Sequence, residues 1–253
     1  MTTTCKNCKA VFTGKFCNQC GQKANVNELN LHDVVHEAWH GITHTDNGIL
    51  RLIKDLFVRP KSVYLNYFAG QRKKYFSPVT FFLISAGILL FLGIKIFDYE
   101  DYKIKEFNEF GRYALLETKF KTILLLPFEI FITWILFRKR YNLAKNIVFW
   151  LYLNGLLFTI KIILTPLYFA FISNKYEIDL LASIIQYVVS LAHLILVFGN
   201  KKWINIIMLF VVSNLVIIAN HLLTGYLLFG NDIFRQSGTS NILELILKVY
   251  SYN

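Results

Sequence analysis

Four cysteines lie within the first 20 residues and form two CxxC pairs: Cys5, Cys8, Cys17 and Cys20. Each pair can place two thiolates on one cation, and four thiolates complete the tetrahedral shell that structural zinc prefers. Because that shell leaves no open position for water or substrate, the spacing predicts a structural zinc site. A disulfide pair or a redox motif is the alternative, and a cytoplasmic N-terminus would count against it.

Four of the six histidines follow one another at intervals of four residues: His32, His36, His40 and His44. On a helix this spacing places neighbours on one face. The segment from His36 to His40 also matches HExxH, in which two histidines hold zinc while the glutamate, here Glu37, activates the bound water. Chemistry of that kind would make the chain a zinc metallopeptidase.

Three hypotheses for these histidines stay open. Their helix can lie on the cytoplasmic membrane surface, with the histidines in water or among headgroups. The stripe of His36, His40 and His44 can instead bind a metal without catalysis, or His36, Glu37 and His40 can form a peptidase site. The first hypothesis is favoured, because intramembrane peptidases usually carry the motif within a span and here it precedes every predicted span.

The histidines require a helix, and residues 31–44 have the pattern of an amphipathic one. Asn30 is its expected N-cap, with Asp33 three residues later. The side opposite the histidines repeats apolar residues at helical intervals, namely Leu31, Val34, Val35, Ala38, Trp39 and Ile42. We therefore expect the apolar side of this helix to lie against the membrane.

A second amphipathic stretch begins at Ile49 and is expected to end at Arg59-Pro60, since the residue before proline disfavours helix. Its predicted polar side holds Arg51, Lys54 and Asp55. Its predicted apolar side holds Ile49, Leu50, Leu52, Ile53, Leu56 and Phe57. This stretch belongs to the segment that leads to the first predicted span.

A basic and tyrosine-rich segment comes directly before that span. Arg72, Lys73 and Lys74 lie among tyrosines, in the arrangement that suits a membrane interface. Aromatic rings favour the depth of the headgroups, and cations meet anionic lipid there. We predict that these three residues form a lipid-facing basic collar.

The composition indicates a membrane protein. Hydrophobic residues make up 55% of the 253-residue chain and charged residues 17%, a balance that excludes disorder, collagen and a charged coiled coil. A span needs about 20 mostly apolar residues. Five stretches qualify, at residues 76–97, 119–137, 146–173, 178–198 and 203–230.

The distribution of charge predicts the orientation of these spans. Most of the 27 Lys and Arg residues fall on the side of the N-terminus, and most acidic residues fall on the other side. The positive-inside rule then places the N-terminus in the cytoplasm and, with five spans, the C-terminus outside. The net charge of +11 therefore reflects membrane topology, and it does not predict nucleic-acid binding.

Polar residues inside the predicted spans are candidate functional groups, because ionisable side chains are costly in hydrocarbon. Glu129 lies in the second predicted span and Lys161 in the third. Counting along the helices places Asn154 at nearly the same depth as Glu129, which makes it the better-matched neighbour. Hydrogen bonding between helices is the favoured explanation, and a polar path for a proton or small solute is the alternative.

The N-terminal third resembles an uncharacterised bacterial family of multi-span membrane proteins with a four-Cys zinc ribbon. The resemblance covers roughly residues 5–85. It rests on the run from Phe16 through Cys17, Cys20 and Gly21 to Gln22, on Asp46-Asn47-Gly48-Ile49-Leu50, and on Pro60, Tyr67, Gly70-Gln71-Arg72-Lys73-Lys74-Tyr75 and Pro78. That family has no assigned activity, so the resemblance implies an architecture and no chemistry.

The predicted fold is a mainly α membrane protein with about five transmembrane helices. It comprises a zinc ribbon at 1–24, a cytoplasmic amphipathic neck at 25–75 and a transmembrane bundle at 76–253 that ends in a short interfacial segment. Zinc is the expected cofactor. The predicted role at the inner membrane is non-enzymatic, with the ribbon recruiting or sensing a cytoplasmic protein partner. The alternatives are a metallopeptidase and a small-solute or proton conductor.

Overall fold

The computed structural model describes residues 2–26, 28–31, 33–34, 48–103, 126–170 and 175–199. It is mostly helical, with one small sheet near the N-terminus. The histidines of the predicted stripe and the predicted span 203–230 lie outside the described residues.

The N-terminal lobe, which we define as residues 2–26, is built on a β-hairpin. Strands β1 (Thr2–Thr4) and β2 (Val11–Thr13) pair antiparallel, with Thr3 opposite Phe12. Phe12 is buried against the cysteines. Apart from that one ring the lobe has little apolar interior, so the region of the cysteines must supply much of what holds it together.

Two short helices follow the connector to the lobe. Helix α2 runs Gly48–Val58 and helix α3 runs Pro60–Phe68, with Pro60 in the first turn of α3. The predicted end of the amphipathic stretch at Arg59-Pro60 is therefore confirmed. Proline suits this position because a first-turn N–H has no partner within the helix.

The predicted polar side of α2 is wrong at one residue. Asp55 is only 3% exposed, whereas Arg51 and Lys54 are exposed as expected. The Arg59 guanidinium explains the difference, because it donates two hydrogen bonds to the Asp55 carboxylate at 2.9 and 3.1 Å. A carboxylate paired in this way can be buried at a much lower cost than an unpaired one.

The predicted apolar side of α2 is buried only in part. Leu52 and Leu56 are fully buried, and Ile49 and Ile53 are partly buried. Leu50 and Phe57, which were predicted on the same side, are exposed.

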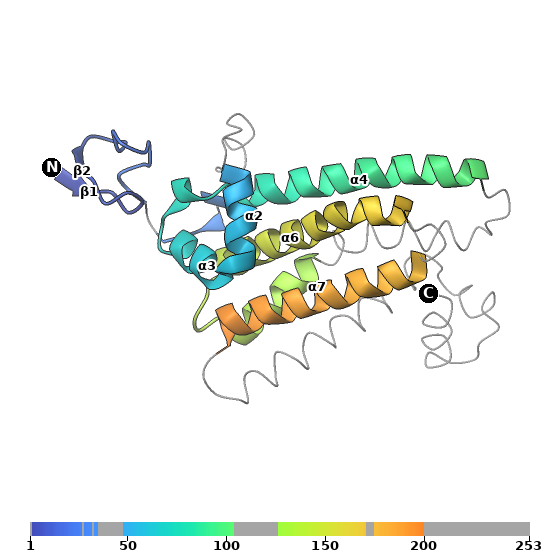
Figure 1. Ribbon diagram of the computed structural model, residues 1–253. Helices are drawn as coiled ribbons and strands as arrows, with labels where there is room; N and C mark the ends of the chain where they lie inside the picture. The colour runs from blue at the N-terminus through green and yellow to red at the C-terminus, as the bar shows by residue number, and fades with distance from the viewer. Residues whose placement is uncertain are drawn as a thin grey trace.

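Among the described residues, three long helices form the bundle: α4 (Pro78–Lys103), α6 (Leu143–Ala170) and α7 (Lys175–Phe198). They run side by side, and α2 and α3 lie across the end nearest the N-terminal lobe (Figure 1). A shorter apolar helix, Leu126–Phe137, also belongs to the bundle.

Helices α4 and α6 approach closely at Gly155. A Cβ atom at this position would lie 2.6 Å from Cδ1 of Phe81, a distance that real contacts do not allow. Glycine therefore lets the buried Phe81 ring of α4 lie on the backbone of α6. Small residues serve this purpose in helix pairs within membranes.

Aromatic rings fill the space between the short helices and the bundle. Tyr64 of α3 lies 5.0 Å from Phe149 of α6, and Phe149 lies 4.7 Å from Phe198 of α7, measured between ring centroids. Tyr67 meets Tyr152 edge to face at 5.6 Å. All five rings are buried. This packing joins α3, α6 and α7 into one core.

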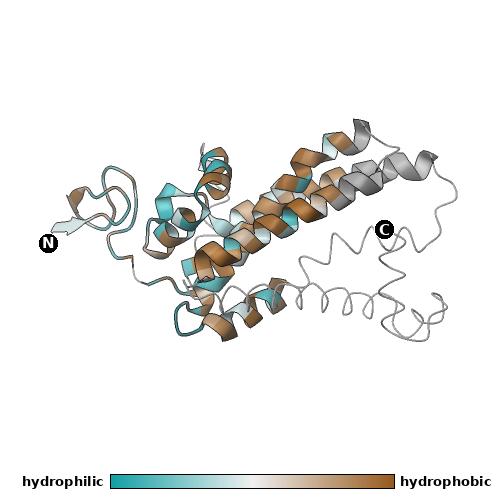
Figure 2. Cartoon of the chain, turned by 60° about the horizontal axis from the view of Figure 1, so that its bottom comes forward, coloured by the Kyte–Doolittle hydropathy of each residue, from teal (hydrophilic) through white to brown (hydrophobic). Residues whose placement is uncertain are grey.

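Two stretches of the described residues are long and apolar enough to cross a membrane, Arg72–Leu92 and Leu143–Leu167. Helices Leu126–Phe137 and Ile184–Phe198 are apolar but shorter. The predicted count of five spans is therefore not confirmed by the described part of the chain. Figure 2 shows the long helices as mainly hydrophobic, with hydrophilic residues gathered around the lobe and the two short helices.

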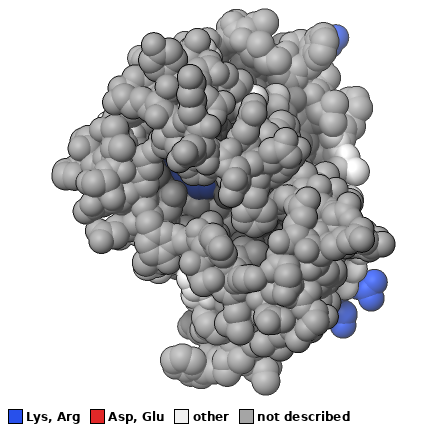
Figure 3. All heavy atoms as spheres, turned by 90° about the vertical axis from the view of Figure 1, so that its right-hand side faces the viewer, with Lys and Arg blue, Asp and Glu red and all other residues white. Residues whose placement is uncertain are grey.

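Figure 3 views the end of the bundle that lies away from the N-terminal lobe, where a few Lys and Arg atoms of the described residues are visible. The lobe and the segment that carries Arg72, Lys73 and Lys74 lie at the opposite end (Figure 1).

Candidate metal centre

The four cysteines converge at one point of the N-terminal lobe, as their spacing predicts. All four Sγ atoms lie within 4.8 Å of one another, and the pairs Cys5–Cys20 and Cys8–Cys17 are each separated by 3.5 Å. None of the four forms a disulfide. Tetrahedral zinc with bonds of about 2.3 Å would separate its sulfur ligands by about 3.8 Å. The observed distances are thus those of a four-coordinate cation site.

The two CxxC turns have the same backbone geometry. The Lys9 N–H donates to the Cys5 carbonyl at 3.0 Å, and the Gly21 N–H donates to the Cys17 carbonyl at 2.9 Å. Lys9 and Gly21 also share a positive φ, at 67° and 69°. Each turn is therefore closed by a left-handed residue directly after its second cysteine, which glycine adopts freely and lysine only at a cost.

The thiols differ in how readily they ionise. Burial opposes ionisation of Cys5, but hydrogen bonds from the backbone of Cys8 and Asn7 hold its pKa at about 6. The Ala10 backbone favours the Cys8 thiolate, yet burial and the other three sulfurs raise the pKa of Cys8 to about 12. Four negative sulfurs in contact repel one another, so full ionisation of the cluster requires a bound cation.

The lobe is joined to the start of the bundle through Gln22, two residues after Cys20. Gln22 is 3% exposed. Its Oε1 accepts hydrogen bonds from the backbone N–H groups of Arg72 at 3.2 Å and Lys73 at 3.4 Å. These N–H groups belong to the one-turn helix η1 (Arg72–Lys74). One glutamine therefore links the metal site to the segment that begins the first candidate span.

Lys6 and Gly70 make a second contact between the lobe and this segment. The Lys6 ammonium donates to the Val26 carbonyl, and its stem lies over Gly70. A Cβ atom on Gly70 would lie 3.1 Å from Cδ of Lys6 and 3.2 Å from Cγ1 of Val26. The φ of Gly70 is +96°, so both the backbone conformation and the close approach favour glycine here.

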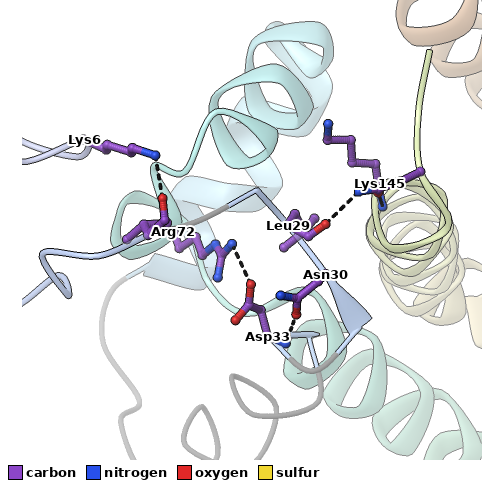
Figure 4. Close-up of polar contacts among 8 residues, drawn as sticks. Lys6, Leu29, Asn30, Asp33, Arg72 and Lys145 are labelled. Carbon is purple, nitrogen blue, oxygen red and sulfur yellow. Dashed lines mark hydrogen bonds and ion pairs between the residues drawn. The ribbon is translucent and has the colours of Figure 1, made fainter. Parts of the chain in front are cut away.

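The connector after the lobe is tied to the bundle by hydrogen bonds and an ion pair, and Figure 4 shows the hydrogen bond to the Leu29 carbonyl. Leu29 is 1% exposed, and its carbonyl accepts a hydrogen bond from Asn142 at 2.8 Å. Lys145 pairs with Glu28 at 2.6 Å. Because Lys145 donates a hydrogen bond to the Glu28 carboxylate and faces it with its charge, the pKa of Glu28 is lowered.

Asn30 caps the helix that the sequence predicts from residue 31. The Asp33 N–H donates to Oδ1 of Asn30 at 2.8 Å (Figure 4), so the predicted cap is confirmed. The Asp33 carboxylate in turn pairs with the Arg72 guanidinium at 3.2 Å.

The three residues of the predicted basic collar have different surroundings. Arg72 faces inward, where its guanidinium side chain is 12% exposed and contacts Asp33. Lys73 is exposed to solvent. Lys74 is half-buried and lies 5.3 Å from the centre of the Tyr75 ring. Arg72 thus acts within the molecule, and Lys73 is the exposed residue of the predicted collar.

The structure brings together two of the three polar residues predicted inside the spans. The Asn154 side chain hydrogen-bonds to the Glu129 carboxyl group, and Asn154 is 2% exposed. Lys161 is half-buried two turns further along α6. The residues of the HExxH hypothesis (His36, Glu37, His40, together with His44) lie outside the described residues.

Sequence reasoning missed the residues that dock the lobe. Gln22 ends the segment Phe16–Gln22, and nothing in that segment indicates that the Gln22 side chain bonds residues 50 positions away. Asn142, which donates to the Leu29 carbonyl, lies in no motif or periodic pattern of the sequence. Asp33 was recognised only as part of a cap signal, and its pairing with Arg72 has no local signature.

Residues 46–90 match a family described as a protein of unknown function (DUF3667). The matched residues comprise α2, α3, η1 and the first part of α4, and they include Gly70 and Arg72, which contact the lobe and its connector. No curated protein and no solved structure matches the chain.

Proposed function

We propose that this chain is a multi-span membrane protein whose N-terminal lobe binds one structural zinc ion and presents a docked platform for a cytoplasmic protein partner. The convergence of the four thiols carries this proposal. A set of four cysteine sulfurs suits zinc better than magnesium or calcium, which prefer oxygen ligands. A shell closed by four protein ligands gives the metal a folding role and not a catalytic one.

Lipid contact is supported by the exterior of α4. Only 33% of the apolar stretch Arg72–Leu92 is buried inside the molecule. Leu83, Ile88 and Phe91 of this stretch are exposed. A helix that is apolar on its exposed side as well as its buried side needs an apolar medium around it. We therefore assign α4 and α6 to the membrane.

The charge distribution orients the protein in the inner membrane with the lobe in the cytoplasm. Lys73 is exposed at the end of the bundle where the lobe docks, at a position where a cation can meet anionic headgroups. A reducing cytoplasm also keeps the cysteines available for metal.

The lobe has two exposed apolar side chains that a protein partner can use. Val11 and Phe16 are exposed, with 66% and 55% of their surfaces accessible. The contacts made by Lys6 and Gln22 hold the lobe in one orientation. A zinc-stabilised lobe that is held in place can present such residues with little loss of conformational entropy on binding.

A complementation experiment in the source organism tests the non-enzymatic role. We expect Cys17→Ser with Cys20→Ser to give the phenotype of a deletion and Glu37→Gln to behave as wild type. Phe16→Ser, which leaves the four ligands intact, should lose function while zinc is retained. A Glu37→Gln phenotype as severe as deletion, in a folded and zinc-loaded protein, would instead establish the peptidase, because that substitution removes only the general base.

Cysteine labelling in intact cells tests the orientation. The matched variants are Lys139→Cys, at an exposed position after helix Leu126–Phe137, and Lys105→Cys, in the predicted external loop. Both carry Ser at the four native cysteines. An impermeant maleimide should label position 105 and not position 139. The reverse pattern would invert the orientation, and labelling of both would contradict the predicted span between them.

A further inference from the structure

A chain of polar contacts lies inside the bundle where helix Leu126–Phe137 packs against α6. Trp150 donates its indole N–H to the Thr133 hydroxyl at 2.9 Å, and that hydroxyl donates to the Glu129 carbonyl at 2.9 Å. Asn154 donates to the Trp150 carbonyl at 3.0 Å and also hydrogen-bonds to the Glu129 carboxyl group. The two helices are thus joined by four polar residues within an apolar core.

The Glu129 carboxyl group is incompletely satisfied in this arrangement. The Asn154 amide has two N–H donors, and the Trp150 carbonyl takes one of them. One donor is left for Glu129, and the other carboxyl oxygen, Oε2, is buried with no hydrogen-bond partner among the described residues. A charged carboxylate has about four acceptor sites. Burial of that charge with a single donor would cost several kcal/mol.

Charged groups on the neighbouring elements do not compensate this carboxyl group within the described part of the chain. Lys161 of α6 lies about 10 Å further along the helix axis than Asn154. Arg138, at the end of the helix that carries Glu129, is about 13 Å away along its axis. His193 of α7 uses its Nδ1 to bond the Val189 carbonyl and packs edge to face on Tyr64. Among the described residues, the surroundings of Glu129 are therefore neutral donors and apolar side chains.

We propose that Glu129 is a proton-binding site inside the helical bundle. At neutral pH the Glu129 side chain is the neutral acid. Asn154 is its hydrogen-bond partner, and the proton lies on the buried Oε2 atom. An interhelical hydrogen bond alone would need only an amide at position 129, whereas a carboxyl group can also exchange a proton. This site is independent of the zinc lobe and goes beyond the proposed platform role.

Carbodiimide labelling of the full zinc-loaded chain in detergent tests this site. The O–H of a neutral carboxylic acid adds across one C=N bond of the reagent, and the product rearranges to a stable N-acylurea that mass spectrometry can assign to one peptide. Dicyclohexylcarbodiimide, an apolar reagent, should label Glu129 at neutral pH, and labelling should fall as the pH rises. A charged water-soluble carbodiimide should not label it.

The chain contains its own control. Glu28 has a side chain that is 72% exposed, so it should prefer the water-soluble reagent. Glu129→Gln should abolish the bundle adduct while zinc content and thermal midpoint are unchanged, because a neutral amide replaces a neutral acid. Asn154→Leu removes a donor that favours the charged form, so it should increase the labelled fraction at alkaline pH.

Three results would overturn the proposal. One is no labelling of Glu129 by the apolar reagent in the folded protein. Another is labelling by the water-soluble reagent to the same extent as Glu28, which would show a solvated carboxylate. The third is a loss of Glu129 labelling when Na⁺ is added at constant pH, which would show that the carboxyl group binds a metal cation.

Discussion

The N-terminal lobe contacts the rest of the molecule through backbone N–H groups, amides and charged side chains. In the bundle, aromatic rings and a glycine make the close contacts between the helices. Gln22 holds the lobe through two hydrogen bonds, and Arg72 holds the connector through one ion pair. Phe81 and Phe149 are instead fully enclosed by other side chains. The lobe is thus docked largely through directional contacts, whereas close packing joins α3, α4, α6 and α7, and polar contacts join helix Leu126–Phe137 to α6.

Because of this difference, we expect different substitutions to undock the lobe and to destabilise the bundle. A hydrogen bond contributes about 1 kcal/mol net, because water satisfies the same groups when the lobe is not docked. The dock therefore depends on a lobe that is already folded, which under the proposed function requires bound zinc. Packing between apolar helices has no such competitor, and it depends on shape alone. Substitutions should accordingly release the lobe without disturbing the bundle, or the reverse.

The largest effect is expected from Gly155→Leu. The new side chain would occupy the space of the Phe81 ring and force α4 away from α6, with a loss of about 3 kcal/mol. We expect a large drop in the thermal midpoint of the purified protein in detergent, with zinc content unchanged. Gly87→Leu on α4 is the matched control, because a Cβ atom there meets nothing within 4 Å. Equal effects of the two substitutions would contradict the close packing.

A smaller effect is expected from Gln22→Leu, which keeps the volume of the side chain and removes its acceptor. Two backbone N–H groups, on Arg72 and Lys73, lose their partner, at a cost of about 1–3 kcal/mol. Limited proteolysis should then cleave between the lobe and α2 while zinc stays bound and the bundle melts as in wild type. Gln19→Leu, at an exposed position of the same CxxC turn, should leave the cleavage rate unchanged.

The ion pair between Asp33 and Arg72 should contribute less. Both side chains are partly shielded from water, so a double-mutant cycle should give a coupling of about 1 kcal/mol. The single variants are Asp33→Asn and Arg72→Gln, and the readout is the protease susceptibility of the connector. Additive effects of the two substitutions would show that this pair does not hold the connector.

The smallest effect concerns pH. The pKa of Glu28 is lowered by Lys145, so this pair contributes stability at pH values above the ordinary pKa of the carboxyl group. That contribution is lost as the pH falls through the folded-state pKa, when the carboxylate takes up a proton. Protease susceptibility of the connector should therefore increase in mild acid, and Lys145→Gln should remove this pH dependence. The same acid response in both proteins would assign it to another group.

Sequence patterns predicted the features that depend on residues close together in the sequence. The convergence of the cysteines, the helix end at Pro60 and the Asn30 cap are each fixed by a few adjacent residues. The burial of Asp55 was also readable in principle, because Arg59 stands one helical turn later and can pair with it.

Contacts between distant segments could not be predicted. Gln22 and Arg72 are 50 residues apart, and no periodicity reports which amide will meet which backbone group. Arg72 was assigned to lipid because basic residues before a span usually meet headgroups, and its actual partner, Asp33, lies on a different element. The depth argument for Glu129 and Asn154 did find neighbours, because helical rise converts sequence position into depth.

The metal content of the protein tests whether the four cysteines of the lobe hold one zinc ion. Zinc should be measured by elemental analysis of the purified full chain and of the variant with Cys17→Ser and Cys20→Ser, next to Gln19→Leu as a control. We expect one zinc per chain in the wild type and in the Gln19→Leu control. The double-cysteine variant should have none, and its residues 1–24 should be digested by protease while the bundle stays folded. Full zinc content in that variant would contradict the four-cysteine site.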